Sequence, residues 1–372
     1  MTFRERYLET LLFGKPDKVP LLPGGPREST LQAWRRQGLV EEDYYAAMVK
    51  ELGLPPIQND MVDPGVSFEM LPMFEEKVLE HKEGHYVVQD WQGAIVEISD
   101  KFDVTYLRFA RDFVTRKWHR FPVENRDDFE RMKERYRVDT PGRFPEDYAS
   151  KAAEMNDSGA VTAVMVKGPF WKLRDWLGLE NLCMLFIEDP DFVRDMIGFW
   201  KDFVLEALDR TLEHLRLDRI MFSEDMAYKA HSMISPAMAR EFLQPSYFAW
   251  VDLVKSRGCP IVDVDSDGYI GELIPVWIEA GINCCDPIEV AAHNDIVAFR
   301  KQFGKKMAYT GGIDKRAIAA GGSAIVAEVE RVAPLVKEGG YIPGCDHGVP
   351  PDVSWPNFVE YSRLLARVCG WV

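Results

Sequence analysis

The second half of the chain alternates between short apolar runs and longer amphipathic stretches. The apolar runs are rich in β-branched residues and end in glycine or polar residues, as buried parallel strands do. Predicted strands cover residues 160–167, 219–222, 260–264, 282–285, 306–310 and 340–342. Predicted helices cover residues 171–177, 190–215, 236–255, 272–280, 294–303, 315–319, 324–337 and 355–367. Strands that alternate with helices of this length predict a parallel sheet with both faces covered.

Repetition of this unit through the second half favours a closed barrel over an open, doubly wound sheet. A phosphate-binding glycine fingerprint would mark the open fold, and none follows the first of these strands. A length of 372 residues is normal for a (β/α)8 TIM barrel that carries insertions. We therefore expect one (β/α)8-barrel domain over residues 1–372.

The first 150 residues are less regular. A helix is predicted at residues 3–12, and Val19–Leu22 is the predicted first barrel strand. Residues 76–99 read as antiparallel hairpins with turns at residues 82–84 and 92–93. We expect this N-terminal helical and β-hairpin region, about residues 60–125, to form an insertion over the barrel mouth.

Composition narrows the class of protein. The formal net charge is −15, so binding to nucleic acid or to an anionic membrane is not expected. No signal peptide or window long enough to span a membrane is visible. The six cysteines contain no Cys-x-x-Cys pair and read as free thiols of a reducing compartment, which makes the cytoplasm the expected location.

Polar residues follow several predicted strands directly. They lie in the runs Ser223-Glu224-Asp225, Asp265-Ser266-Asp267-Gly268, Asp286-Pro287-Ile288-Glu289 and Gly344-Cys345-Asp346-His347. In a barrel, residues at these strand ends face one mouth. Carboxylates with one imidazole and one thiol suit a divalent metal ion. Adjacent carboxylates also raise one another's pKa and suit general acid–base catalysis, so the residues alone leave both chemistries open.

Structural roles compete with these functional ones. The run Asp265–Gly268 is also typical of a turn that caps the next helix, and Cys345 has the character of a small core residue. Phe170, Trp171 and Trp176 stand at helical spacing, which favours the core and leaves the wall of a site for a planar substrate as the alternative. His347, between an aspartate and a glycine at a strand end, is the strongest candidate for a functional residue.

Six segments carry a family resemblance in their order and spacing. They are Lys167–Trp171, Ser223–Ala227, Ser235-Pro236, Asp265–Gly268, Gly311–Lys315 and Gly344–Gly348. At these segments the sequence resembles the uroporphyrinogen decarboxylase-like superfamily, which also contains cobalamin-dependent methyltransferases. The resemblance covers most of the chain and implies a (β/α)8 barrel.

Departures from the family pattern select a branch. Decarboxylases of the family carry an arginine-rich N-terminal motif, whereas the corresponding run here, Leu22–Arg27, has one arginine. Such a site would neutralise a porphyrinogen's carboxylates poorly. Methyltransferases that act on thiols bind zinc through His-x-Cys and a later Cys. Here Asp265 and Asp267 stand at the first two positions and Cys345 at the third. The resemblance therefore implies an altered metal site, with zinc as the candidate metal. Its candidate ligands are Asp265, Asp267, Cys345 and His347.

The pattern looks most like the corrinoid-dependent O-demethylases. These enzymes move a methyl group from a methoxylated, often aromatic, small molecule to the Co(I) of a corrinoid protein. The resemblance thus implies a corrinoid cofactor carried by a partner protein, and a homodimer is an assembly to be tested. The expected catalytic residues are His347, Asp265, Asp267 and Glu224, and the expected substrate-binding residues are Arg27, Phe170, Trp171, Asp225 and Tyr228. The alternatives are a decarboxylase or lyase of a small carboxylated substrate, or a non-catalytic barrel that binds a ligand.

Overall fold

A curled parallel sheet forms the centre of the protein. The computed structural model describes residues 1–110 and 112–372, and within them seven strands pair in the order β1-β6-β7-β8-β9-β10-β11. Every neighbouring pair is parallel. The strands are β1 (Met61–Val62), β6 (Val161–Lys167), β7 (Arg219–Ser223), β8 (Ile261–Asp265), β9 (Cys284–Asp286), β10 (Ala308–Ile313) and β11 (Tyr341–Cys345). All six strands predicted from the second half are confirmed within three residues.

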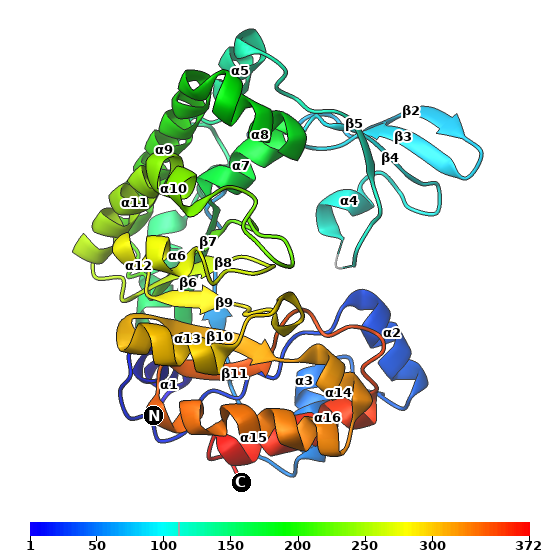
Figure 1. Ribbon diagram of the computed structural model, residues 1–372, viewed down its shortest axis with the longest axis vertical. Helices are drawn as coiled ribbons and strands as arrows, with labels where there is room; N and C mark the ends of the chain where they lie inside the picture. The colour runs from blue at the N-terminus through cyan, green and yellow to red at the C-terminus, as the bar shows by residue number, and fades with distance from the viewer. Residues whose placement is uncertain (111) are drawn as a thin grey trace.

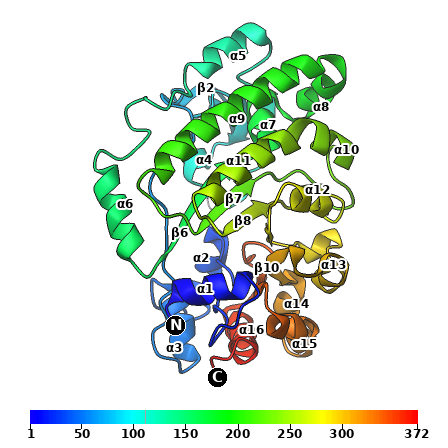
Figure 2. The same cartoon turned by 90° about the vertical axis from the view of Figure 1, so that its left-hand side faces the viewer.

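Helices cover the outer face of this sheet. Figure 2 shows α9, α11, α12 and α13 lying in front of the strands. The helices are α1 (Phe3–Leu11), α2 (Glu28–Arg36), α3 (Tyr44–Glu51), α4 (Tyr106–Phe109), α5 (Arg126–Lys133), α6 (Tyr148–Asp157), α7 (Pro169–Leu177), α8 (Leu179–Glu188), α9 (Pro190–Leu212), α10 (Pro236–Met238), α11 (Gln244–Ser256), α12 (Ile274–Glu279), α13 (Ile296–Phe303), α14 (Lys315–Ala320), α15 (Ser323–Glu338) and α16 (Trp355–Val368). The fold is therefore α/β, with the parallel sheet that the alternation predicts.

The predicted first barrel strand, Val19–Leu22, is wrong as a strand. Prolines at positions 20 and 23 have no N–H to donate, so they cannot sustain a ladder of hydrogen bonds. The segment is nevertheless held beside β11, where the carbonyl of Pro23 accepts from Cys345 N at 3.1 Å. On its other side the carbonyl of Leu21 accepts from Asn59 Nδ2 at 3.2 Å, next to β1. The described sheet thus has seven strands, and a closed barrel of eight remains a prediction.

A second sheet stands apart from the helical layer. Its four described strands are antiparallel, in the order β2 (Lys77–Lys82), β3 (His85–Gln89), β4 (Ile95–Ser99) and β5 (Lys117–Arg120). Both predicted hairpins and their turns are confirmed. In Figure 1 this sheet and α4 lie on the right, and α9 and α11 lie on the left. Near the predicted start of the insertion, β1 belongs to the parallel sheet, and the antiparallel sheet begins at β2.

Two expectations from composition also have structural outcomes. All six cysteines, which lie in the described ranges, are free thiols, and five of them are buried. Among the described residues, no helix has the length and apolar character needed to cross a membrane.

Candidate active site

A pocket of about 810 Å³ lies where the antiparallel sheet meets the carboxyl ends of β6 and β7. Five of its lining residues are aromatic, and they come from the antiparallel sheet and its flanks, from α7 and from the loop after β7. They are Trp91, Trp118, Phe121, Trp171 and Tyr228. Charged side chains lie among them, namely Arg116, Lys167, Arg174, Asp175, Glu180 and Asp225. A planar ligand with a few polar groups fits such a lining.

Glu224 fixes the helix that carries Trp171. Its carboxylate is fully buried and accepts a hydrogen bond from Trp171 N at 3.1 Å, and Tyr247 Oη donates to its other oxygen. Gly168 lets the carboxylate approach the start of α7, because a Cβ there would lie 2.1 Å from it. Burial raises the pKa of Glu224 to about 7. With no exposed surface, the carboxylate supports the pocket wall, and the prediction that it acts directly in catalysis is corrected accordingly.

Three of the predicted substrate-binding residues, Trp171, Asp225 and Tyr228, line the pocket. Asp225 has a positive φ of 40°, and Arg174 donates to its side chain at 2.9 Å and to its carbonyl at 2.8 Å. The Arg174 guanidinium also lies over the Trp171 ring at 4.8 Å. Phe170 was predicted wrongly, because its ring is completely buried in the core and cannot touch a ligand.

The loop after β8 lies directly against the loop after β7. A Cβ on Gly268, whose φ is +81°, would lie 2.3 Å from the carbonyl of Ala227. Tyr269 N donates to the carbonyl of Tyr228 at 2.7 Å. Because Asp267 immediately precedes Gly268, it is anchored beside the wall of the aromatic pocket.

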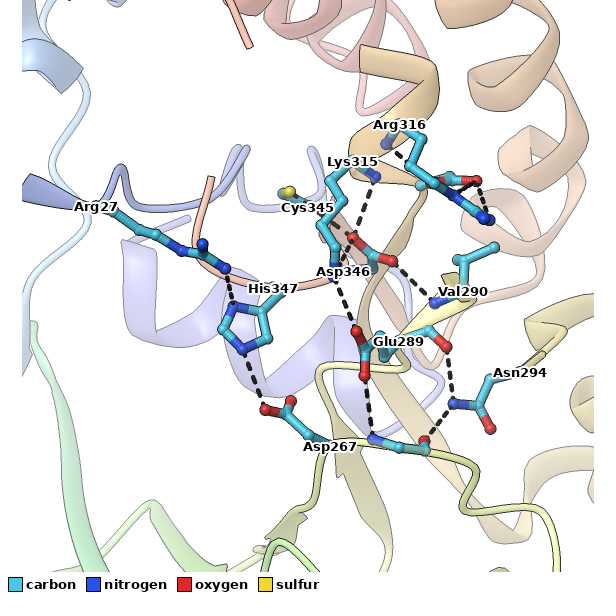
Figure 3. Close-up of polar contacts among 12 residues, drawn as sticks. Arg27, Asp267, Glu289, Val290, Asn294, Lys315, Arg316, Cys345, Asp346 and His347 are labelled. Carbon is cyan, nitrogen blue, oxygen red and sulfur yellow. Dashed lines mark hydrogen bonds and ion pairs between the residues drawn. The ribbon is translucent and has the colours of Figure 1, made fainter. Parts of the chain in front are cut away.

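His347 joins Asp267 across the strand ends, as Figure 3 shows. Its Nε2 lies 3.1 Å from Asp267 Oδ2, and its Nδ1 lies 3.5 Å from Arg27 Nη2. The hydrogen bond to Asp267 raises the pKa of His347, and burial and the charges of Lys315 and Arg27 oppose that rise. The Arg27 guanidinium in turn rests on the Phe113 ring at 4.4 Å. The predicted residues Arg27, Asp267 and His347 therefore form one contact group.

Asp265 has the properties of an acid at neutral pH. Ser223 Oγ donates to its Oδ2 at 2.8 Å. Burial raises the pKa of Asp265 to about 7, and the nearby carboxylates of Asp286 and Asp267 act in the same direction. About half of such carboxyl groups hold a proton at pH 7, so this side chain can donate one.

A network behind the mouth holds both loops, and its contacts were not predicted. The buried Asp346 carboxylate accepts from Val290 N at 2.9 Å and from Lys315 N at 3.1 Å. Lys315 Nζ donates to Glu289 at 3.0 Å, and Glu289 accepts from Gly268 N at 3.1 Å (Figure 3). These contacts fix the position of Gly268 and therefore of the aspartate before it.

The four predicted metal ligands do not form a ready-made site. Within residues 1–110 and 112–372, no group of three or more His, Cys, Asp or Glu side chains is arranged to hold a metal ion. Of the four, His347 and Asp267 contact one another, whereas Asp265 bonds Ser223. Cys345 is buried, and burial raises the pKa of its thiol to about 12, which keeps it protonated. The donor set as folded does not fit zinc.

Sequence reasoning missed the residues that the antiparallel sheet contributes. Trp91, Arg116, Trp118 and Phe121 all line the pocket. The signal was an alternation of basic and aromatic residues in β5 and its flanks, from position 116 to 121. That pattern does not show which face of a largely exposed strand meets the barrel.

A parallel α/β fold with polar groups at the carboxyl ends of its strands defines an enzyme-like class. The family model of uroporphyrinogen decarboxylase (URO-D) matches residues 119–362, about two thirds of the chain. The protein belongs to this family.

Three solved structures are similar to this chain at low sequence identity, and the first of them shares its fold. A methyltransferase from Methanosarcina mazei is 13% identical with a TM-score of 0.57, over 100% of this chain and 98% of that one. A B12-independent methionine synthase from Shewanella sp. W3-18-1 is 13% identical with a TM-score of 0.40, over 60% of this chain and 65% of that one. A putative vitamin-B12 independent methionine synthase from Listeria monocytogenes is 10% identical with a TM-score of 0.41, over 94% and 96%. No curated protein sequence matches the chain.

Proposed function

We propose that this protein is a methyltransferase that moves a methyl group from a methoxylated aromatic small molecule to the Co(I) of a corrinoid protein. The observation that carries the proposal is a pocket with five aromatic residues in its lining, bounded after β7 by a loop against which the loop of Asp267 packs. Membership of the URO-D family supports it, and so does the full-length likeness to a methyltransferase.

The reaction breaks the bond between the methyl carbon and the ether oxygen. Reduced cobalt, supplied by the partner protein, gives the electron pair for the new bond to the methyl carbon. The ether oxygen keeps the electrons of the broken bond and takes up one proton, so the products are a phenol and the methylated corrinoid. A phenolate leaves poorly without that proton, and the enzyme's task is to deliver it.

Asp265 is the proposed proton donor, because its raised pKa keeps a proton available near neutral pH. His347, paired with Asp267, is the proposed second proton-carrying group, since its own pKa is raised by that pairing. The aromatic wall, with Trp171 and Tyr228, orients the ring of the methyl donor and excludes water from it. No step is assigned to zinc, because the candidate ligands do not fit that ion as folded.

The experiment combines the purified protein, a Co(I) corrinoid protein and a panel of methoxylated benzenes, phenols and benzoates. We expect the absorbance change of corrinoid methylation together with an equal amount of demethylated phenol. Asp265→Asn should slow the reaction by about 10²-fold or more, in line with the loss of a general acid. Asp252→Asn, at an exposed carboxylate on α11, is the matched control. Ligands that bind across the panel without any methyl transfer would refute the proposal.

A decarboxylase or lyase of a small carboxylated substrate is the second candidate. The specific observation in its favour is Arg116, a cation in the pocket that can hold a carboxylate. Release of CO₂ without any corrinoid protein would support this function over methyl transfer. Full activity or ligand binding after alanine substitution of Asp265, Asp267 and His347 would instead favour a non-catalytic barrel.

A further inference from the structure

We propose that the pocket recognises an aromatic carboxylate, with Arg116 as the anchor of the carboxylate group. This inference rests on the proposed function and narrows its methyl donor to methoxylated aryl acids. Nothing in the family match names this residue, because Arg116 lies before the matched region begins at residue 119.

Arg116 immediately precedes β5 and lines the pocket. Its guanidinium lies over the Trp118 ring, 5.8 Å from the ring centre. Among the described residues, no side chain or carbonyl forms an ion pair or hydrogen bond with it. Burial lowers the pKa of Arg116, because a half-buried charge is less well solvated than one in water.

The other buried charges of the pocket already have partners. Lys167 Nζ donates to Asp175 at 2.7 Å, and Arg174 donates to Asp225 at 2.9 Å. Glu180 also lines the pocket, but it is exposed on the first turn of α8, where water screens its charge.

Two carboxylates lie near Arg116 without bonding it, namely Asp90 and Asp175. Asp90 is buried and uses its Oδ1 to accept from Gln92 N at 3.0 Å and from Ala94 N at 2.9 Å. Asp175 is bonded to Lys167. Both are therefore committed elsewhere, and the donors of Arg116 remain available to a ligand.

The chemistry of the ligand follows from these surroundings. A planar guanidinium forms two parallel hydrogen bonds to a carboxylate, which is a stronger and more directional contact than a lysine gives. Trp91, Trp118 and Trp171 offer flat faces on which an aromatic ring stacks.

Arg116 flanks the antiparallel sheet, and Asp225 and Tyr228 belong to the opposite wall after β7. A bound aryl acid thus has its carboxylate at β5 and the far edge of its ring toward the loops that hold the acid groups. A methoxy group on that far edge faces Asp225 and Tyr228, in the loop after β7 against which the loop of Asp267 packs.

Binding can be measured without any methyl transfer, by calorimetry or by quenching of tryptophan fluorescence. Three probes distinguish the contribution of the ligand's charge from that of its aromatic ring. They are para-methoxybenzoate, its neutral amide, and the corresponding cyclohexane acid. We expect the benzoate to bind about 10- to 100-fold more tightly than the amide, as hydrogen bonds to a charged group do. It should also bind more tightly than the cyclohexane acid, because a saturated ring does not stack.

Arg116→Gln should remove the preference for the acid over the amide and leave the amide's affinity unchanged. Arg116→Lys should recover part of the preference. Arg120→Gln is the matched control, because Arg120 lies on β5, is paired with Glu124 and does not line the pocket. Melting temperatures of all variants show whether each one is folded.

Equal affinity of the native protein for acid and amide would overturn the inference, and so would a preference that survives Arg116→Gln. Tight, Arg116-dependent binding of the acid without transfer of its methyl group would uphold the binding site and refute the proposed methyltransferase.

Discussion

Replacing Asp265 by asparagine should make the protein more stable and less active at the same time. The amide has nearly the same shape as the carboxyl group and can still accept from Ser223 Oγ. What changes is charge. The folded protein holds Asp265 with a pKa of about 7, whereas the unfolded chain has the ordinary value of 3.8. The folded state therefore binds the proton more tightly, and folding must work against ionisation of this group as the pH rises.

The size of the effect follows from linkage between proton binding and folding. A carboxyl group whose pKa is higher in the folded state does not affect the free energy of unfolding at a pH below its pKa in the unfolded chain. As the pH rises from that value to the pKa in the folded state, the free energy of unfolding decreases. With values of 3.8 and about 7, the free-energy cost of Asp265 is about 1.7 kcal/mol at pH 5 and about 4 kcal/mol at pH 8. Asparagine removes this cost, so the gain in unfolding free energy should grow by up to about 2.5 kcal/mol between these two pH values.

Denaturant unfolding of the native protein and of Asp265→Asn at pH 5 and pH 8 measures this difference directly. Asp252→Asn, at an exposed site, should show no such pH dependence. The methyl-transfer rate of Asp265→Asn, measured on the same preparation, should fall by about 10²-fold or more. An unchanged unfolding free energy at both pH values would refute the reasoning, because Asp265 would then be an ordinary solvated carboxylate.

Three further substitutions test other parts of the structure. His347→Ala should cut turnover by about 10²-fold or more but cost only about 1 kcal/mol of stability. That cost is measured below pH 6.5, where protonated His347 is fully paired with Asp267, and it disappears as the pH rises through the raised pKa of His347. Early melting with normal turnover would contradict a catalytic role. Gly178→Ala should cost about 1–3 kcal/mol and weaken ligand binding, because φ is +77° and a Cβ would lie 2.3 Å from the Phe121 ring in the pocket wall; a melting temperature and affinity equal to the native ones would contradict it. Arg219→Met should lower the free energy of unfolding by about 3–5 kcal/mol at neutral pH, because the substitution leaves the buried Asp263 without its charge partner. Adding Asp263→Leu should restore much of this loss, and a double variant as unstable as the single one would refute that explanation.

The repeating unit of the fold was predictable because each strand is an apolar run that is largely buried and most helices have one apolar face. The strands β6 to β11 therefore stand out as continuous apolar runs. The N-terminal edge of the sheet was not predictable in the same way. Val19–Leu22 has the apolar character of a strand, but its prolines remove the donors that a ladder needs. Met61–Val62 does pair in the sheet, yet two residues carry too little pattern to be recognised.

The site was predictable only to the level of which loops converge. The run Glu224-Asp225 shows the limit, because its two neighbouring carboxylates lie in opposite surroundings. A positive φ at Asp225 turns that side chain to Arg174 and the pocket, whereas Glu224 is sealed beneath α7. Sequence spacing cannot show such a turn for a residue other than glycine, because this backbone region is rarely adopted. The buried network through Asp346 and Lys315 was not predictable for a different reason, because it joins loops that are distant in the sequence and adjacent only in the fold.

The division of the pocket between two sheets has a consequence for how its specificity can change. Asp265, Asp267 and His347 depend on contacts among the loops of the parallel sheet, which the buried network behind Gly268 holds in place. Arg116 depends on an antiparallel sheet with its own small core of Val88, Val96, Ile98 and neighbouring side chains. Because substitutions at sites without shared partners act nearly independently, changes in β5 can alter which ligand binds without disturbing the acid groups. If the proposed roles of Arg116 and Asp265 hold, recognition of the ligand and delivery of the proton can be varied one at a time.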